Sequence, residues 1–294
     1  REPAAGEALQ TFLEEYEEPK LEAIAVTSGP GLEPALWVGV NFAKALALMW
    51  NLPVIPVNHM EGHVLASIYD SDRDEQLSDI AFPTVALLSS GGPAELVLMK
   101  GWGQYEKIGQ TRDDAVGEAF DKVARLLDLP YPGGPEISRL ASEARQQNLP
   151  PYTDLPAPML HSGDLDFSFS GLKTAVRYAI EGKDLSETDQ QALARDFEDI
   201  VTDILYKKTA TAVEEYGLHA VVVGGGVSAN RYIKQEFEKR FLASHPDLTV
   251  YFPAPGLSTD NSIMIALAGH AKLDGALSSE GAQHIRADGN KSIA

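Results

Sequence analysis

Apolar positions along the chain follow two spacings, one typical of strands and one typical of helices. Short aliphatic runs predict strands over residues 23–27, 54–57, 84–88, 95–99, 219–223 and 249–252. Helical spacing predicts helices over residues 7–17, 35–50, 113–127, 136–145, 186–216, 230–242 and 260–273. This alternation of strands and helices predicts an α/β fold in which sheets are flanked by helices.

One pair of predicted strands indicates that a sheet is mixed and not purely parallel. Residues 84–88 and 95–99 flank the short glycine turn Ser89-Ser90-Gly91-Gly92-Pro93, which predicts a β-hairpin. Residues 150–163 are rich in proline and polar residues and are expected to form a surface loop.

Composition narrows the class of protein. With 294 residues, 44% of them hydrophobic, the chain exceeds the usual size of one domain, so two lobes are expected. It has no Cys, so a metal site would need nitrogen and oxygen ligands. The longest apolar helical stretch, residues 35–50, is interrupted by Asn41 and Lys44 and is too short to cross a membrane. The net charge of −19 opposes binding of nucleic acid except through a local basic patch or a partner.

The sequence His59-Met60-Glu61-Gly62-His63 follows the predicted strand 54–57. Helical residues four apart lie about 40° from one another, so both imidazoles can reach one metal ion. A metallopeptidase would place a glutamate directly after the first histidine, whereas Glu61 lies about 200° round the helix from His59. The alternative is that both histidines only cap or pack at the start of a helix.

Asp260 is a candidate third ligand. It stands in Ser258-Thr259-Asp260-Asn261, at the start of the predicted helix 260–273. An aspartate in that position is commonly an N-cap, and its position alone favours the cap.

Glycine-rich turns follow two of the predicted strands. Ser89 to Gly92 follows strand 84–88, and Gly224-Gly225-Gly226 follows strand 219–223 and opens a helix. Both turns could bring backbone N–H groups against a phosphate or nucleoside, or they could be tight turns only. Asp121 belongs to a predicted helix and could reach ribose hydroxyls, or it could belong to a solvated helix face.

Six ordered blocks resemble the TsaD family of tRNA N6-adenosine threonylcarbamoyltransferases. In chain order they are His59-Met60-Glu61-Gly62-His63, Gly117-Glu118-Ala119-Phe120-Asp121-Lys122, Tyr131-Pro132-Gly133-Gly134-Pro135, Phe167-Ser168-Phe169-Ser170-Gly171-Leu172-Lys173-Thr174, Gly224 to Asn230, and Thr259-Asp260-Asn261. The resemblance extends from Arg1 nearly to the C-terminus.

The resemblance implies a reaction and a set of site residues. The family transfers a threonylcarbamoyl group from threonylcarbamoyl-AMP to N6 of the adenosine just 3′ of the anticodon, in tRNAs that read codons beginning with A, and AMP leaves. The implied ligands of one divalent metal ion, Fe2+ in preference to Zn2+, are His59, His63 and Asp260. The implied contacts to the substrate are Leu88, Ser89, Ser90, Gly91, Gly92, Asp121, Gly134 and Asn230.

The resemblance also implies a two-lobed actin and sugar-kinase-like fold. We expect residues 1–80 to form what remains of the first lobe, with its metal-binding histidines. Residues 81–260 would form the second lobe with the adenylate-binding turns, and residues 261–294 would return to the first lobe. The expected partners are tRNA and TsaB-like and TsaE-like proteins in the cytoplasm, with no membrane. The protein partners are expected to bind near residues 7–17 and 35–50.

Two departures from the family pattern keep an alternative open. The family begins with a strand and a turn close to Glu-Thr-Ser-Cys-Asp-Glu-Thr, so we expect the first lobe to lack its N-terminal strands. The family's Ser-Gly-Gly-His-Thr reads Ser90-Gly91-Gly92-Pro93-Ala94 here, which removes two polar side chains. The alternative function is a catalytically weak scaffold that binds adenylate or a partner. A metallopeptidase is disfavoured by the position of Glu61.

Overall fold

The computed structural model describes residues 3–15, 20–69, 80–89 and 92–294. The chain divides into two compact units, Arg1–His59 with Ile265–Ser292, and Met60–Met264 with Ile293–Ala294. The first boundary falls after the first residue of one helix, α3 (His59–Ile68), and the second falls within another, α9 (Ser262–His270). Helix α3 packs against a strand of the second unit, because Ser67 Oγ donates to Val223 O at 3.0 Å.

The first unit is built on two parallel strands, β1 (Ile24–Gly29) and β2 (Val54–Asn58). Its helices in the N-terminal part are α1 (Pro3–Glu15) and α2 (Glu33–Trp50). The C-terminal part adds the 3-10 turns η2 (Leu273–Gly275) and η3 (Gly281–His284). Its small core consists of Val40, Ala43, Ala47, Val54, Ala282 and Ile285.

The last residues of the first unit pack against the turn after β1. The backbone N–H of Asp288 donates to Ser28 O, and Gly31 N–H donates to Gly289 O. At Gly29, φ is 153°, and a Cβ there would lie 2.0 Å from Asp288 O. Glycine is therefore required at this position by the close approach of the C-terminal segment.

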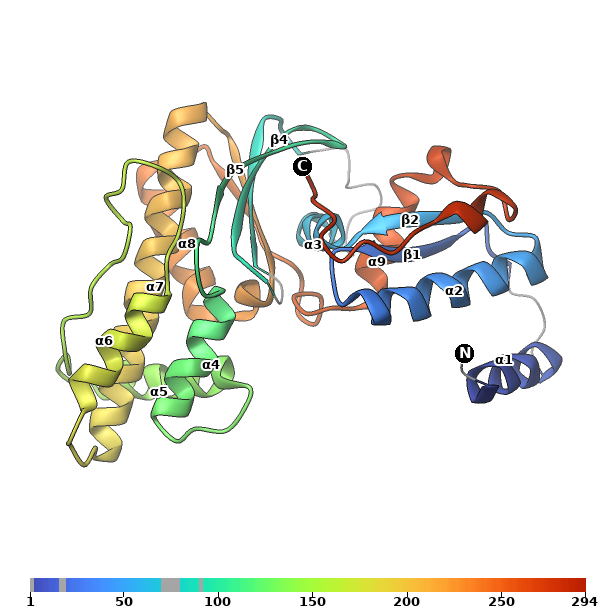
Figure 1. The fold of residues 1–294 in the computed structure, drawn as a ribbon. Coiled ribbons are helices and arrows are strands. Elements are labelled where there is room, and N and C mark those ends of the chain that lie inside the picture. The colour runs from blue at the N-terminus through green and yellow to red at the C-terminus, as the bar shows by residue number, and fades with distance from the viewer. Residues whose placement is uncertain (1–2, 16–19, 70–79, 90–91) are drawn as a thin grey trace. The chain divides into compact units, whose positions relative to one another are not determined.

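The second unit contains a five-stranded mixed sheet in the order β5-β4-β3-β6-β7 (Figure 1). The strands are β3 (Thr84–Ser89), β4 (Glu95–Gly101), β5 (Gln104–Gln110), β6 (Ala220–Gly225) and β7 (Thr249–Tyr251). The β3–β4 and β4–β5 pairs are antiparallel, and the β3–β6 and β6–β7 pairs are parallel. The predicted hairpin and the mixed sheet are confirmed.

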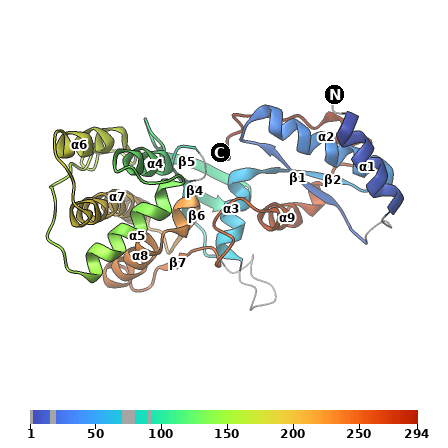
Figure 2. The same cartoon turned by 90° about the horizontal axis from the view of Figure 1, so that it is seen from below.

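Five longer helices gather on one side of this sheet in both views (Figures 1 and 2). They are α4 (Val116–Leu126), α5 (Gly133–Gln146), α6 (Ser170–Ile180), α7 (Glu187–Tyr216) and α8 (Arg231–Ser244), with the turn η1 (Gly226–Ala229) before α8. The apolar stripe of α4 is buried as its spacing predicts, at Val116, Phe120, Val123 and Leu127. The predicted α/β architecture with mixed sheets flanked by helices is confirmed.

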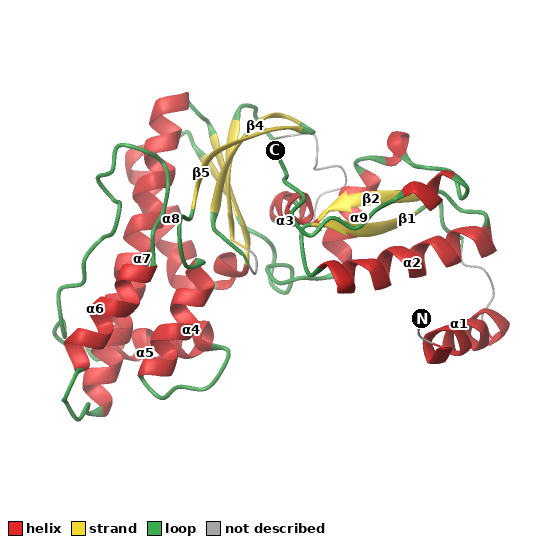
Figure 3. Cartoon of the chain, viewed as in Figure 1, coloured by secondary structure: helices red, strands yellow, loops and turns green. Residues whose placement is uncertain are grey.

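Strand β5 and helix α6 are among the elements that the sequence pattern missed (Figure 3). Strand β5 lies at the sheet edge and is mostly polar, so it lacks the aliphatic run that marks a buried strand. Helix α6 buries only Leu172 and Val176, which is too short a stripe to stand out. Residues 150–163 carry no helix or strand, which confirms the predicted loop. Across the described ranges, no helix has the length and apolar character needed to cross a membrane.

Candidate metal and adenylate site

The two histidines lie on one helix, directly after a strand. Strand β2 ends at Asn58, and α3 begins at His59, which places His63 one turn further along. The side chain of His63 is almost fully buried, whereas His59 is half-buried. The local fold therefore provides the shared helix face that the spacing predicted.

Asp260 lies beside His63. Its Oδ1 is 3.2 Å from His63 Nε2, and 70% of its side chain is exposed. The N-cap of helix α9 is supplied by the next residue, because Asn261 Oδ1 accepts a hydrogen bond from Met264 N–H. Asn261 therefore caps α9, and Asp260 faces the histidine.

The ligand atoms of His59, His63 and Asp260 lie within 4.8 Å of one another. Two imidazole nitrogens and one carboxylate oxygen suit a divalent transition metal and leave coordination positions for a substrate. The residues present therefore fit the metal that the family resemblance implies.

Glu61 is not a member of the cluster formed by His59, His63 and Asp260. It is buried, and its Oε1 accepts a hydrogen bond from Tyr105 Oη of strand β5 at 2.9 Å. Burial, followed by the charge of Glu61, raises the pKa of Tyr105 well above its ordinary value, so the phenol remains a donor. A carboxylate committed to Tyr105 is not placed as the base of a metallopeptidase.

The two strands that precede the predicted glycine turns are neighbours in the sheet. Strands β3 and β6 are parallel neighbours, with Leu88 beside Gly224 and Ser89 beside Gly225. Both turns leave the carboxyl ends of their strands, which is where open α/β sheets bind ligands. Leu88 is fully buried, so it could contact a ligand only through its backbone.

Ser90 and Gly91, two of the predicted substrate contacts, lie outside the described residues. Gly92 is half-buried in the bend that precedes β4. Pro93 is exposed there, whereas Ala94 is fully buried and its N–H donates to Thr111 Oγ1 at 3.0 Å.

Asp121 and Gly134 are linked through helices α4 and α5. Asp121 Oδ1 accepts a hydrogen bond from Gly133 N–H at 2.7 Å, at the start of α5. A Cβ at Gly133 would lie 2.5 Å from Ala124 Cβ, so only glycine allows α4 and α5 to approach this closely. Gly134 follows in the first turn of α5, where backbone N–H groups have no helical acceptor and can bind an anion or hydroxyl.

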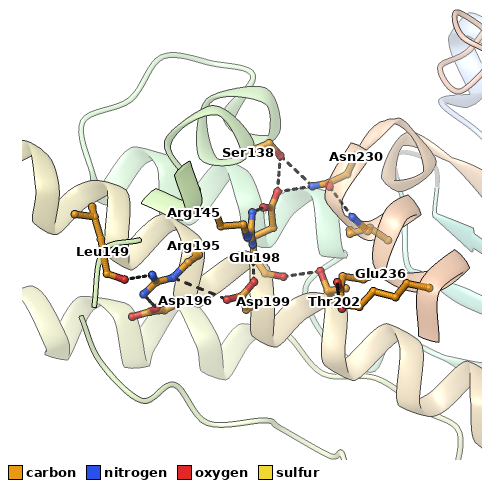
Figure 4. Close-up of polar contacts among 12 residues, drawn as sticks. Ser138, Arg145, Leu149, Arg195, Asp196, Glu198, Asp199, Thr202, Asn230 and Glu236 are labelled. Atoms are coloured by element: carbon orange, nitrogen blue, oxygen red, sulfur yellow. Dashed lines mark hydrogen bonds and ion pairs between the residues drawn. The ribbon is translucent and has the colours of Figure 1, made fainter. Parts of the chain in front are cut away.

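Asn230 is the N-cap of α8 and is part of a polar network (Figure 4). Its Oδ1 accepts from Ile233 N–H at 3.0 Å, and its Nδ2 donates to Ser138 Oγ at 2.9 Å and Glu198 Oε1 at 2.7 Å. Ser138 lies one turn beyond Gly134 on α5. The structure thus connects Asp121, Gly134 and Asn230 within the second unit.

Sequence reasoning missed Ser138 and Glu198. Glu198 is fully buried on the long helix α7, between Ala194 and Val201 on its apolar face. A lone carboxylate at a core position of a helix was the available signal, because a charge is rarely buried unless it is paired. Ser138 carried no signal of its own.

Comparison with known proteins identifies the family to which the chain belongs. A model of the family "TsaD: tRNA N6-adenosine threonylcarbamoyltransferase" matches residues 3–267. A Nitrosomonas europaea protein of that name is 48% identical over 255 residues, covering 86% of this chain and 72% of the relative. A Bacillus subtilis protein of the same name is 46% identical over 254 residues, covering 85% and 69%.

Solved structures of another protein share the fold. T. kodakarensis HypF superposes with a TM-score of 0.60 at 15% identity, covering 92% of this chain and 43% of HypF. Full-length HypF "in the phosphate- and nucleotide-bound form" gives 0.61 at 16% identity, covering 93% and 42%. At such identities the likeness is one of fold. Together with the family match it confirms the predicted fold class.

Proposed function

The chain belongs to the TsaD family of tRNA N6-adenosine threonylcarbamoyltransferases. We propose that it therefore adds a threonylcarbamoyl group to N6 of an adenosine in tRNA. The substrate would be threonylcarbamoyl-AMP, and the acceptor N6 of the adenosine just 3′ of the anticodon in tRNAs that read codons beginning with A. A bond forms between N6 and the carbamoyl carbon, the bond from that carbon to the phosphate oxygen breaks, N6 loses a proton, and AMP leaves.

The observation that carries this proposal is that the carboxyl ends of β3 and β6, at Ser89 and Gly225, lie side by side. The substrate is an activated mixed anhydride, so the protein mainly has to orient it and stabilise the charge that develops on the carbonyl and phosphate oxygens. Backbone groups of Leu88, Ser89 and Gly92 would contact the substrate from one turn. The backbone groups of Ser90 and Gly91 are the other contacts to the substrate that we propose for this turn.

The nucleoside would lie near the α4–α5 junction and the start of α8. Gly134 offers its backbone N–H in the first turn of α5, and Asp121 holds that turn in place through Gly133. Asn230 presents its carboxamide from the N-cap of α8. These groups would hold the adenylate while the acceptor adenosine approaches the carbamoyl carbon.

His59, His63 and Asp260 would hold one divalent ion, Fe2+ in preference to Zn2+. Such an ion supplies Lewis acidity and a template for oxygen ligands. Support comes from the ligand set and from the position of Asp260 beside His63.

Binding of tRNA would need partner proteins. The net charge of −19 makes this chain a poor tRNA-binding surface by itself, so we propose that TsaB-like and TsaE-like proteins complete it. Helix α2 exposes apolar side chains on one face, including Val38, Phe42 and Met49, and such a stripe suits a protein partner. We propose the cytoplasm as the location, because the proposed tRNA substrate is found there.

A catalytically weak scaffold is the second candidate, favoured by Pro93 and Ala94. The buried Ala94 leaves no polar side chain at that position, and Pro93 offers none beside it. A scaffold would bind adenylate or partners without turnover.

The test is an assay with the purified chain, threonylcarbamoyl-AMP, both partner proteins and unmodified tRNA. The tRNA is then digested and its nucleosides are analysed by mass spectrometry. We expect N6-threonylcarbamoyladenosine to form. AMP binding without any modified nucleoside would support the scaffold instead, and absence of both would reject both functions.

A further inference from the structure

We propose that Glu198 is a positioning residue that fixes the orientation of the Asn230 carboxamide, so that Asn230 meets a hydrogen-bond donor of the bound adenylate. The inference rests on the proposed function, because it deepens the same adenylate site. It assigns a role to a buried carboxylate that lies on none of the turns expected to touch the substrate.

Glu198 is a fully buried carboxylate whose two oxygens have different partners (Figure 4). Its Oε1 accepts from Ser138 Oγ at 2.7 Å and from Asn230 Nδ2 at 2.7 Å. Its Oε2 accepts from Arg145 Nη1 at 2.6 Å. One oxygen therefore accepts hydrogen bonds from both α5 and α8. The other pairs the carboxylate charge with the positive charge of Arg145.

The chemistry of a carboxylate sets the orientation of the amide. An ionised carboxylate only accepts hydrogen bonds, so the side of Asn230 that faces Glu198 has to be the NH2 group. Both hydrogens of Nδ2 are used, by Glu198 and by Ser138. The oxygen of Asn230 is thereby turned to the other side, where Ile233 N–H donates to it.

An amide oxygen carries two lone pairs, and the bond from Ile233 N–H uses one of them. Asn230 is half-buried, and we infer that its exposed part includes the second lone pair of Oδ1. A group that binds there has to donate a hydrogen bond, as a ribose hydroxyl or the adenine amine does. A phosphate oxygen cannot, which places the nucleoside and not the phosphate at Asn230.

Glu198 also sets the distance between two parts of the site. Ser138 lies four residues after Gly134 on α5, and Asn230 begins α8, so a single carboxylate oxygen ties both helices together. Without that oxygen, the Asn230 amide could rotate, and α5 and α8 could shift relative to one another. Both changes would weaken binding of the nucleoside.

The charge and the reach of Glu198 can be tested separately, because Arg145 has a second partner. Arg145 Nη2 donates to Asp199 Oδ1 at 2.5 Å, and its guanidinium lies 3.3 Å from the ring centroid of Tyr232. Glu198→Asp keeps the charge but withdraws the acceptor oxygen by one methylene. Glu198→Gln keeps the length of the side chain but removes the charge and replaces one acceptor oxygen by an NH2 donor. Asp199→Asn is the matched control on the same helix.

The measurement is the affinity of the full chain and these variants for AMP, 2′-deoxy-AMP, 3′-deoxy-AMP and IMP by titration calorimetry. In the wild type, at least one analogue that lacks a donor should bind about tenfold more weakly than AMP. Glu198→Asp should bind AMP about tenfold more weakly and lose that discrimination. Glu198→Gln should also weaken AMP binding, because its NH2 group would face either Arg145 or the donors Ser138 and Asn230. Asp199→Asn should retain both AMP affinity and discrimination.

Other results would overturn the inference. If Asp199→Asn weakened AMP binding as much as Glu198→Asp, charge pairing with Arg145 and not positioning of Asn230 would explain the effect. If Glu198→Asp matched the wild type with every ligand, the tie to Asn230 would have no effect on binding. Failure of these variants alone leaves the transferase standing, whereas a wild type that binds no AMP contradicts the adenylate site as well.

Discussion

Gly224 packs directly against the backbone of His63. A Cβ at Gly224 would lie 3.1 Å from the carbonyl oxygen of His63 and 3.0 Å from Leu88 Cδ2. In addition, Ser67 Oγ of α3 is 3.0 Å from Val223 O of β6. The helix that carries His63 therefore packs against β6, the strand that leads into the second glycine turn. This contact connects a candidate metal ligand with a turn predicted to bind the adenylate.

The first prediction follows from this contact. Gly224→Ala should lower the free energy of unfolding by about 1–3 kcal/mol, because the added methyl group overpacks the space between α3, β3 and β6. The measurement is urea unfolding. Gly226→Ala is the control, since a Cβ there would lie 3.8 Å from its nearest neighbour, Ser89 O. Equal effects of the two substitutions would show that α3 does not rest on Gly224.

The second prediction concerns the metal. His63→Ala should lower the iron or zinc content per chain to near the background level, because it removes one of three ligands and leaves an incomplete set. Elemental analysis by mass spectrometry measures this. His161→Ala, at an exposed histidine of the second unit, should retain the metal. Equal metal content in both variants would eliminate the proposed site.

The third prediction concerns acid stability. Burial tends to raise the pKa of Asp113, but hydrogen bonds from Ser168, Phe169 and Ser170 outweigh it, so the net pKa lies below the ordinary value. A carboxylate with a lowered pKa in the folded state stabilises the fold above the unfolded pKa of about 3.9, and this contribution is lost as the pH falls through the folded value.

Asp113→Asn should therefore lower the thermal unfolding midpoint near neutral pH and reduce its decline between pH 5 and pH 3, taken as a range of about one unit either side of the unfolded pKa. Thermal scans across this range measure both effects. The matched variant Asp247→Asn, at an exposed position, should follow the wild type. A wild-type pH profile in Asp113→Asn would refute the role of this carboxylate.

The fourth prediction concerns the partner surface on α2. Val38 and Phe42 are 67% and 48% exposed one turn apart, so replacing both by glutamate should change the stability of the fold little. We expect affinity for a TsaB-like partner to fall by at least about tenfold, because two apolar contacts would become buried charges. Calorimetric titration with the partner measures it. Tyr178→Glu, at an exposed position on α6, should bind normally.

The sequence predicted the parts of this site that depend on local spacing. The turn from β2 into α3 and the glycine turns after β3 and β6 were visible because histidine spacing and glycine runs are local signals. The link from Glu198 to Asn230 was not visible, since 32 residues separate them and only the packing of α7 against α8 brings them together. The cap at Asn261 also needed the structure, because Asp260 was equally suited to that role by position.

The central claim is group transfer to one adenosine, and the ratio of two products tests it most directly. With threonylcarbamoyl-AMP, both partner proteins and unmodified tRNA, AMP released and modified nucleoside formed should be equal in amount. With a tRNA that carries guanosine in place of the adenosine 3′ of the anticodon, both should fall to background. AMP release at the same rate with both tRNAs, without modified nucleoside, would contradict the claim and indicate hydrolysis.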